Sequence, residues 1–213
     1  MQVPILGIFL NLSIIIPAIA GIYVFKSIAK AYRYFIISIC AGALHEYNAE
    51  FQFTSSILFL SLYSFINTQF ILLLYFNWDA EKIAPIKKGM IHALVFVLVA
   101  IDQYFEFHSA YHIQWAMITS MIGISLYGIR LLTQSQNNFL NNREGLSRKL
   151  IIIPYLVFSV YYATINILMH FLFSKDTQPL FMNLYNVIRW INFISYISYT
   201  LALLWAPKKE KFL

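Results

Sequence analysis

Two pairs of carboxylates stand four residues apart in stretches that are otherwise apolar. Glu46 and Glu50 form the first pair, and Asp102 and Glu106 form the second. Residues at positions i and i+4 share one face of a helix, so each pair presents two acidic groups to the same neighbour. Acidic groups placed in this way could bind a proton or a cation, or act as general acid and base on a substrate.

A metal site is the second chemistry that the sequence suggests. The stretch HSAYH places His108 and His112 four residues apart, which is the spacing at which two imidazoles on one helix face bind zinc. On a continuous helix, His108 lies about 200° around the axis from Glu106. One ion could therefore collect both groups only if the helix ended near Phe107. A metal ion at His108 and His112 is a hypothesis, and any other cofactor is unknown.

The elements that must position these groups are apolar. Of the 213 residues, 60% are hydrophobic and only 11% are charged, whereas charged residues make up roughly a quarter of a soluble protein. This composition predicts one integral, multi-pass membrane domain over residues 1–213. No basic residue precedes the first apolar run, which is also longer than the core of a signal peptide, so we expect it to remain as a helix.

Seven runs are long enough to cross a bilayer, whose core of roughly 30 Å needs about 20 mostly apolar helical residues. They occupy residues 3–25, 34–52, 55–77, 89–108, 112–133, 150–173 and 180–205. The sequence therefore predicts an all-α fold, a seven-transmembrane-helix bundle.

Basic residues predict the orientation of this bundle, because they gather beside the cytoplasmic ends of membrane spans. Only Lys175 flanks one side. The other side is flanked by Lys26, Lys30, Arg33, Lys82, Lys87, Lys88, Arg130, Arg143, Arg148, Lys149, Lys208, Lys209 and Lys211. We thus expect the N-terminus outside and the C-terminus in the cytoplasm, in the plasma (inner) membrane. The basic face should contact anionic lipid, and the net charge of +6 calls for no nucleic acid.

Helical rise places several charges at matching depths. At about 1.5 Å per residue, Glu46 and Asp102 lie about 18 Å from the inner edge, and Glu50 and Glu106 about 24 Å from it. Arg189 in the last span comes to the same level as Glu46. A lone charge near the bilayer centre is costly, so such residues face the bundle interior and pair. The sequence predicts that Arg189 pairs with Glu46 or Asp102.

Further polar residues fall in the same outer half. Asn166 and His170 are spaced i, i+4 in the sixth span, and Asn186 is in the seventh. Together with the charges they predict a polar pocket open to the outside. Two alternatives stay open: Glu50, Glu106 and the histidines of HSAYH could lie in water beyond the membrane, and the central charges could form a purely structural ion pair.

Transport is the function that this pattern favours, because polar residues continue inward from the charged layer. They are Asn67, Thr68, Gln69, His92, Ser195 and Ser198. We expect a transporter of a small polar or ionic solute, which could be coupled to protons. One alternative is a metal- or carboxylate-dependent intramembrane hydrolase acting on a lipid-like substrate. The other is a sensor or receptor subunit that signals through a partner chain.

Three further expectations follow from the sequence. No retinal is expected, since the last span has Arg189 and no lysine for a Schiff base. Whether the protein is an enzyme is left open, because no motif names a reaction. A protein partner or a homo-oligomer is equally compatible with the chain.

Overall fold

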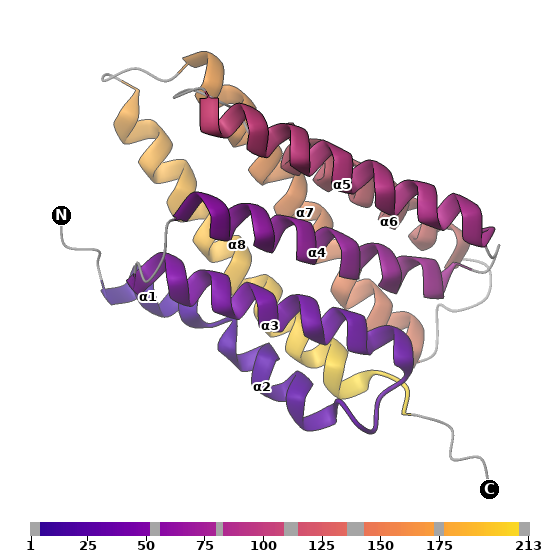
Figure 1. The fold of residues 1–213 in the computed structure, drawn as a ribbon. Coiled ribbons are helices and arrows are strands. Elements are labelled where there is room, and N and C mark those ends of the chain that lie inside the picture. The colour runs from indigo at the N-terminus through magenta and orange to yellow at the C-terminus, as the bar shows by residue number, and fades with distance from the viewer. Residues whose placement is uncertain are drawn as a thin grey trace, which may run out of the picture.

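The computed structural model describes residues 5–51, 56–79, 83–108, 115–135, 143–172 and 177–208, which are almost wholly helical (Figure 1). The helices in these ranges are α1 (Ile5–Leu12), α2 (Ile15–Val24), α3 (Lys30–Phe51), α4 (Ser56–Trp78), α5 (Pro85–His108), α6 (Trp115–Ser135), α7 (Arg143–Leu172) and α8 (Gln178–Trp205). The predicted all-α fold is confirmed.

From α2 onward, successive helices run in opposite directions along one bundle, whereas α1 leads into α2 in the same general direction, as Figure 1 shows. At one end, here called the Glu50 end, α3 and α7 end and α4, α6 and α8 begin. At the other, here called the Asp79 end, α2, α4, α6 and α8 end and α3, α5 and α7 begin. The described chain therefore starts at the Glu50 end and finishes at the Asp79 end (Figure 1).

The first predicted span is interrupted, because α1 and α2 are separated by a turn at Ser13 and Ile14. Pro17 explains the break, since it has no N–H to bond the Ser13 carbonyl and its ring crowds that group. The Ser13 carbonyl instead accepts a bond of 3.0 Å from the amide of Ile16. The Ser13 hydroxyl in turn bonds the Leu10 carbonyl. Because its hydroxyl is bonded in this way, the side chain of Ser13 can face the interior of the bundle at this turn.

Three segments are long and apolar enough to cross a membrane: Leu6–Val24, Arg143–Leu172 and Gln178–Trp205. They coincide with the first, sixth and seventh predicted spans. The other four predicted spans coincide in position with α3, α4, α5 and α6. The helices thus coincide with the apolar runs of the sequence. The three long apolar segments support a membrane protein.

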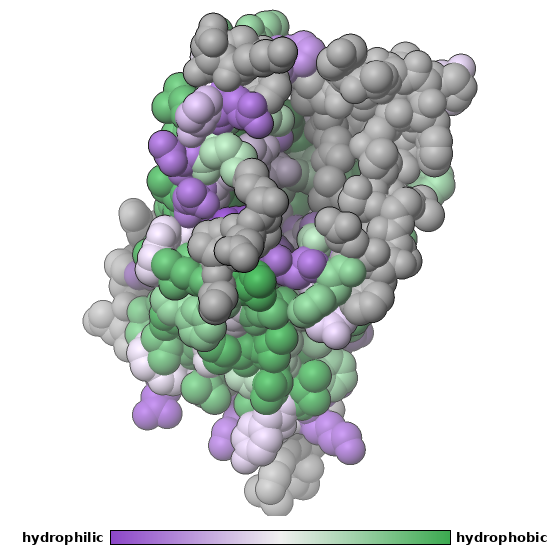
Figure 2. Space-filling view, turned by 90° about the vertical axis from the view of Figure 1, so that its left-hand side faces the viewer, coloured by the Kyte–Doolittle hydropathy of each residue, from purple (hydrophilic) through white to green (hydrophobic). Residues whose placement is uncertain are grey.

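The surface of the bundle carries many large apolar side chains, among them Ile19, Ile22, Leu126 and Leu204, each more than half exposed. Figure 2 views the molecule from the Glu50 end and shows a broad band of hydrophobic side chains between hydrophilic groups at its lower edge and others nearer the middle. Such a surface suits contact with lipid.

Packing places α8 among α1, α2 and α7, whereas α3 packs on α4 and α2 and α6 packs on α7. The main contacts of α5 are with α4 and α6, so α5 lies at the edge of the bundle. The core includes Tyr32, Phe35, Tyr75 and Ile151, which are almost completely buried. These side chains fill the bundle toward the Asp79 end and leave space nearer the Glu50 end.

Candidate functional site

A cavity of about 500 Å³ lies between the helices. It is bounded by residues of α1, α3, α4, α6, α7 and α8, and its described lining includes none from α5. It reaches toward the Glu50 end, since Ala49 and Met182 in its lining lie within about one turn of the end of α3 and the start of α8. Its polar lining comprises Asn11, Ser38, His45, Glu46, Tyr63, Asn67, Tyr155, Tyr162, Tyr185, Asn186, Arg189, Asn192, Ser195, Tyr196 and Tyr199.

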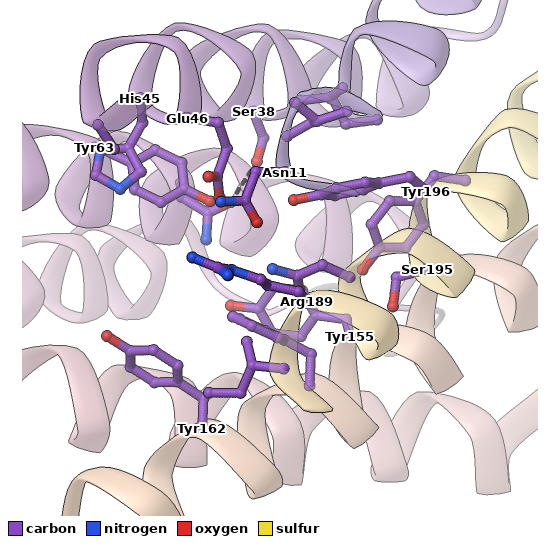
Figure 3. A pocket seen from close by; sticks show the side chains of 18 of the residues that line it. Asn11, Ser38, His45, Glu46, Tyr63, Tyr155, Tyr162, Arg189, Ser195 and Tyr196 are labelled. Atoms are coloured by element: carbon purple, nitrogen blue, oxygen red, sulfur yellow. Dashed lines mark hydrogen bonds between the residues drawn. The ribbon is translucent and has the colours of Figure 1, made fainter. Parts of the chain in front are cut away.

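Two charged residues of opposite sign face this cavity from different helices. Glu46 extends from α3 and Arg189 from α8, and Figure 3 shows both side chains directed into the same space. The charge of Arg189 acts on Glu46 electrostatically. The two residues that the depth estimate placed at one level thus line the same cavity.

The direct pair expected between these two residues is not formed among the residues that the structure describes. The Nη1 of Arg189 instead donates a bond of 3.3 Å to the side-chain oxygen of Asn186, one turn earlier on α8. The reason is geometric: equal depth brings Glu46 and Arg189 to one level, but they stand on walls that the cavity separates. The two charges therefore share a space that a third group could enter.

Aromatic rings surround the acidic side of the cavity. The ring of Tyr63 stacks on His45, with centroids 4.5 Å apart and planes 4° from parallel. The charge of Glu46 also acts electrostatically on Tyr162 and Tyr196. The carboxylate of Glu46 thus lies near the phenolic hydroxyls of three cavity tyrosines, Tyr63, Tyr162 and Tyr196.

Hydrogen bonds between helices hold the polar walls in place. The amide of Asn11 on α1 donates to the carboxylate of Glu50 on α3. Deeper in the bundle, the hydroxyl of Ser38 on α3 donates to the amide oxygen of Asn67 on α4. Glu50 does not itself line the cavity, but it acts electrostatically on Glu46. Its role is to fix α1 beside α3.

Two other predicted site residues lie away from the cavity. The amide of Asn166 donates a bond of 2.8 Å to the Tyr162 carbonyl in its own helix. His170 is exposed near the end of α7, edge-on to Phe171 with centroids 5.0 Å apart. Neither is part of the described lining, whose last residue on α7 is Tyr162, one turn before Asn166.

The remaining predicted residues cannot be placed in the cavity. Asp102, Glu106 and His108 belong to α5 near the Glu50 end, but their side chains lie outside the described part of the structure, as does all of His112. Pairing of Arg189 with Asp102 and the metal site at HSAYH therefore remain predictions. Within the described ranges, no group of three or more His, Cys, Asp or Glu residues is placed to hold a metal ion.

Of the residues thought to continue the path inward, Asn67 and Ser195 line the cavity. Ser195 and Ser198 bond carbonyls one turn earlier in α8, at 2.7 and 3.1 Å. Gln69 and His92 instead bond each other between α4 and α5. The polar path is thus shorter than the sequence suggested.

Sequence reasoning missed most of the aromatic lining. Tyr63, Tyr155, Tyr162 and Tyr196 were indistinguishable from the many tyrosines that pack helices. Asn11 did carry a signal, because it is a lone amide in an apolar run. His45, which the sequence did not mark as a site residue, also lines the cavity.

A second polar group, missed by the sequence analysis, closes the Asp79 end. We call it the Asp79 cluster, comprising Asp79, Tyr127 and Arg130. The side chain of Asp79 is 0% exposed, and its Oδ2 accepts a bond of 2.6 Å from the Tyr127 hydroxyl. An Nη of Arg130 lies 3.6 Å from the same oxygen. The cluster joins the end of α4 to α6.

No protein-family model, curated protein or solved structure matches this chain.

Proposed function

We propose that this chain is a transporter of a small polar or ionic solute, which binds in the cavity between Glu46 and Arg189. The single observation that carries the proposal is that a carboxylate and a guanidinium face one cavity without forming an ion pair among the described residues. Ionisable groups within a membrane bundle are costly and commonly mark a substrate or ion path. Concave sites of this size are also typical of small-molecule binding.

The proposal includes seven spans, with the N-terminus outside and the C-terminus in the cytoplasm. It is supported by the exposed apolar surface of the helices and by the basic residues at the Asp79 end. The Glu50 end would then face outward, and the Asp79 end would meet the anionic lipid of the cytoplasmic leaflet.

Several contacts support a conformation closed toward the Asp79 end. Besides the Asp79 cluster, the hydroxyl of Ser147 on α7 donates a bond of 2.7 Å to the Ala202 carbonyl on α8. The amide of Ala29 donates a bond of 3.0 Å to the Pro207 carbonyl. In an alternating-access cycle these contacts would loosen while the walls of the cavity approach each other at the Glu50 end.

Topology can be tested by labelling single cysteines in intact cells with a membrane-impermeant maleimide. Cys40 would first be replaced by alanine, and one cysteine would then be introduced at Thr177 or at Ser27, near opposite ends of the bundle. We expect labelling at Thr177→Cys without permeabilisation and at Ser27→Cys only after it. The reverse pattern would overturn the orientation. Labelling of both sites in intact cells would place them on the same side of the membrane and so overturn the number of spans.

Transport can be tested in proteoliposomes on a solid-supported membrane, challenged with single amino acids, organic acids, amines and inorganic ions. We expect one class of solute to be taken up, and uptake to be lost in Glu46→Gln and Arg189→Gln. Arg143→Gln and Glu144→Gln are matched controls, because they remove the same charges from the start of α7, away from the cavity. A solute that binds but never crosses would favour a receptor, and a solute cleaved on contact would favour a hydrolase.

A further inference from the structure

The cavity presents opposite charges on two of its walls. Glu46 stands on α3 and Arg189 on α8, and Figure 3 shows a space between their side chains. A solute with one charge would leave either the carboxylate or the guanidinium without a direct partner. A solute with both charges would engage the two walls at once and add no net charge to a site of low dielectric.

Arg189 is suited to the negative end of such a solute. A guanidinium has five N–H donors in a planar fork that matches a carboxylate with two parallel bonds. Asn186 engages Nη1 from one turn earlier on α8 and so holds the side chain in place. The remaining donors are the ones that a ligand carboxylate would use.

Glu46 is suited to the positive end. Its neighbours include Tyr63, Tyr162 and Tyr196, all in the cavity lining. An ammonium group gains both from a carboxylate and from the faces of aromatic rings. The same rings offer apolar surface to a side chain that the ammonium-bearing carbon would carry.

We propose that the cavity binds a zwitterion of the amino acid type, with its ammonium group at Glu46, its carboxylate at Arg189 and its side chain against the tyrosine rings. This assignment rests on the proposed function, because it names the solute class of the same cavity. The volume of about 500 Å³ is in the usual range for a site that encloses a small molecule.

The test is binding to the purified protein in detergent, measured by thermal stabilisation and calorimetry with two matched sets of probes. One set is phenylalanine, 3-phenylpropanoate and phenethylamine, and the other is leucine, 4-methylpentanoate and isopentylamine. Within each set the apolar side chain is the same, and each analogue lacks either the ammonium or the carboxylate group. We expect a zwitterion to bind at least about tenfold more tightly than either singly charged analogue, a factor equivalent to about 1.4 kcal/mol. Equal or tighter binding of an analogue, or no binding of either amino acid, would overturn the assignment.

Substitutions at Glu46 and Arg189 test which wall of the cavity binds which charged group of the ligand. Glu46→Gln should remove the preference over the acid analogue but keep the preference over the amine, and Arg189→Gln should do the reverse. Arg189→Lys keeps the charge but loses the fork, so it should weaken zwitterion binding less than Arg189→Gln does. The control Arg143→Gln should bind as the parent does. Loss of both preferences in each folded variant, judged by its melting curve, would contradict the arrangement.

Failure of this inference and failure of the proposed function give different results. A zwitterion that binds in detergent but is not carried into proteoliposomes would overturn transport and leave the binding mode standing. Conversely, uptake of a singly charged solute in preference to amino acids would overturn the zwitterion and leave transport standing.

Discussion

The hydroxyl of Tyr127 on α6 donates a hydrogen bond of 2.6 Å to Asp79, whose carboxylate is completely buried just beyond the end of α4. Arg130 lies one turn further along α6 and approaches the same oxygen to 3.6 Å. A buried carboxylate is thus held between a phenol and a guanidinium, and two helices are joined where the sequence showed only the start of a polar loop.

The Asp79 cluster should respond to single substitutions in a fixed order. Asp79→Asn removes the charge from both contacts and should lower the free energy of unfolding by about 2–3 kcal/mol, since hydrogen bonds to charged groups contribute about 1.5–3 kcal/mol. Tyr127→Phe should cost less, and Arg130→Gln least, because the Arg130 side chain is 43% exposed and its ion pair is screened by water. Melting curves in detergent would test this order. An Arg130→Gln variant less stable than Asp79→Asn would contradict it.

Two glycines of α6 offer a matched test of helix packing. A Cβ added at Gly128 would lie 3.0 Å from a methyl of Ile152 and 3.3 Å from the Tyr75 hydroxyl, whereas one added at Gly123 would meet nothing within 4 Å. Gly128→Leu should therefore destabilise the bundle by roughly 1–3 kcal/mol or more through overpacking against α7.

Gly123→Leu is the control for that substitution. Gly123 lines a second, largely apolar cavity of about 350 Å³ between α4, α5 and α6, which can accept the new side chain. Leucine in place of glycine also gains up to about 1 kcal/mol of helix propensity at either site. The control should melt at or above the temperature of the parent, and a lower melting temperature for it than for Gly128→Leu would show that α6 does not pack as described.

The contact between α7 and α8 at Ser147 should be sensitive to both volume and hydrogen bonding. Ser147 and Ala202 are each 0% exposed, and the serine hydroxyl bonds the alanine carbonyl at 2.7 Å. Ser147→Ala should cost about 0.5–1.5 kcal/mol, the net value of a typical hydrogen bond. Ala202→Leu should cost more, because small residues allow helices to approach closely. Equal melting temperatures for the two variants would argue against this contact.

Helix positions and part of the cavity were predictable from the sequence, for different reasons. Apolar runs between charged breaks place most ends of the described helices to within a few residues. The exceptions are α7, which begins at Arg143 ahead of the predicted start at residue 150, and the first run, which Pro17 splits. A rise of about 1.5 Å per residue brings Glu46 and Arg189 to one level. Depth contains no information on the order of helices around the bundle, so Tyr63 and Tyr162 could not be placed beside them. Asp79 could not be recognised as buried, because Glu81 and Lys82 follow it closely in the sequence, yet its side chain is 0% exposed.

Replacement of a carboxylate by an amide should have opposite effects on stability at Glu46 and at Asp79. Glu46 faces the cavity without a hydrogen bond or ion pair to the rest of the described chain, whereas Asp79 is held by Tyr127 and Arg130. A carboxylate in a poorly solvated site without a close partner is costly to keep charged. Glu46→Gln should therefore raise the melting temperature, with a gain of about 0.5–2 kcal/mol, while it removes the preference for a zwitterion over its acid analogue. Asp79→Asn, the same replacement of a carboxylate by an amide, should lower the melting temperature. Opposite signs would show that Glu46 is retained for binding at a cost in stability. If both variants melted lower by similar amounts, Glu46 would be a structural residue, and the solute site would have to be sought elsewhere.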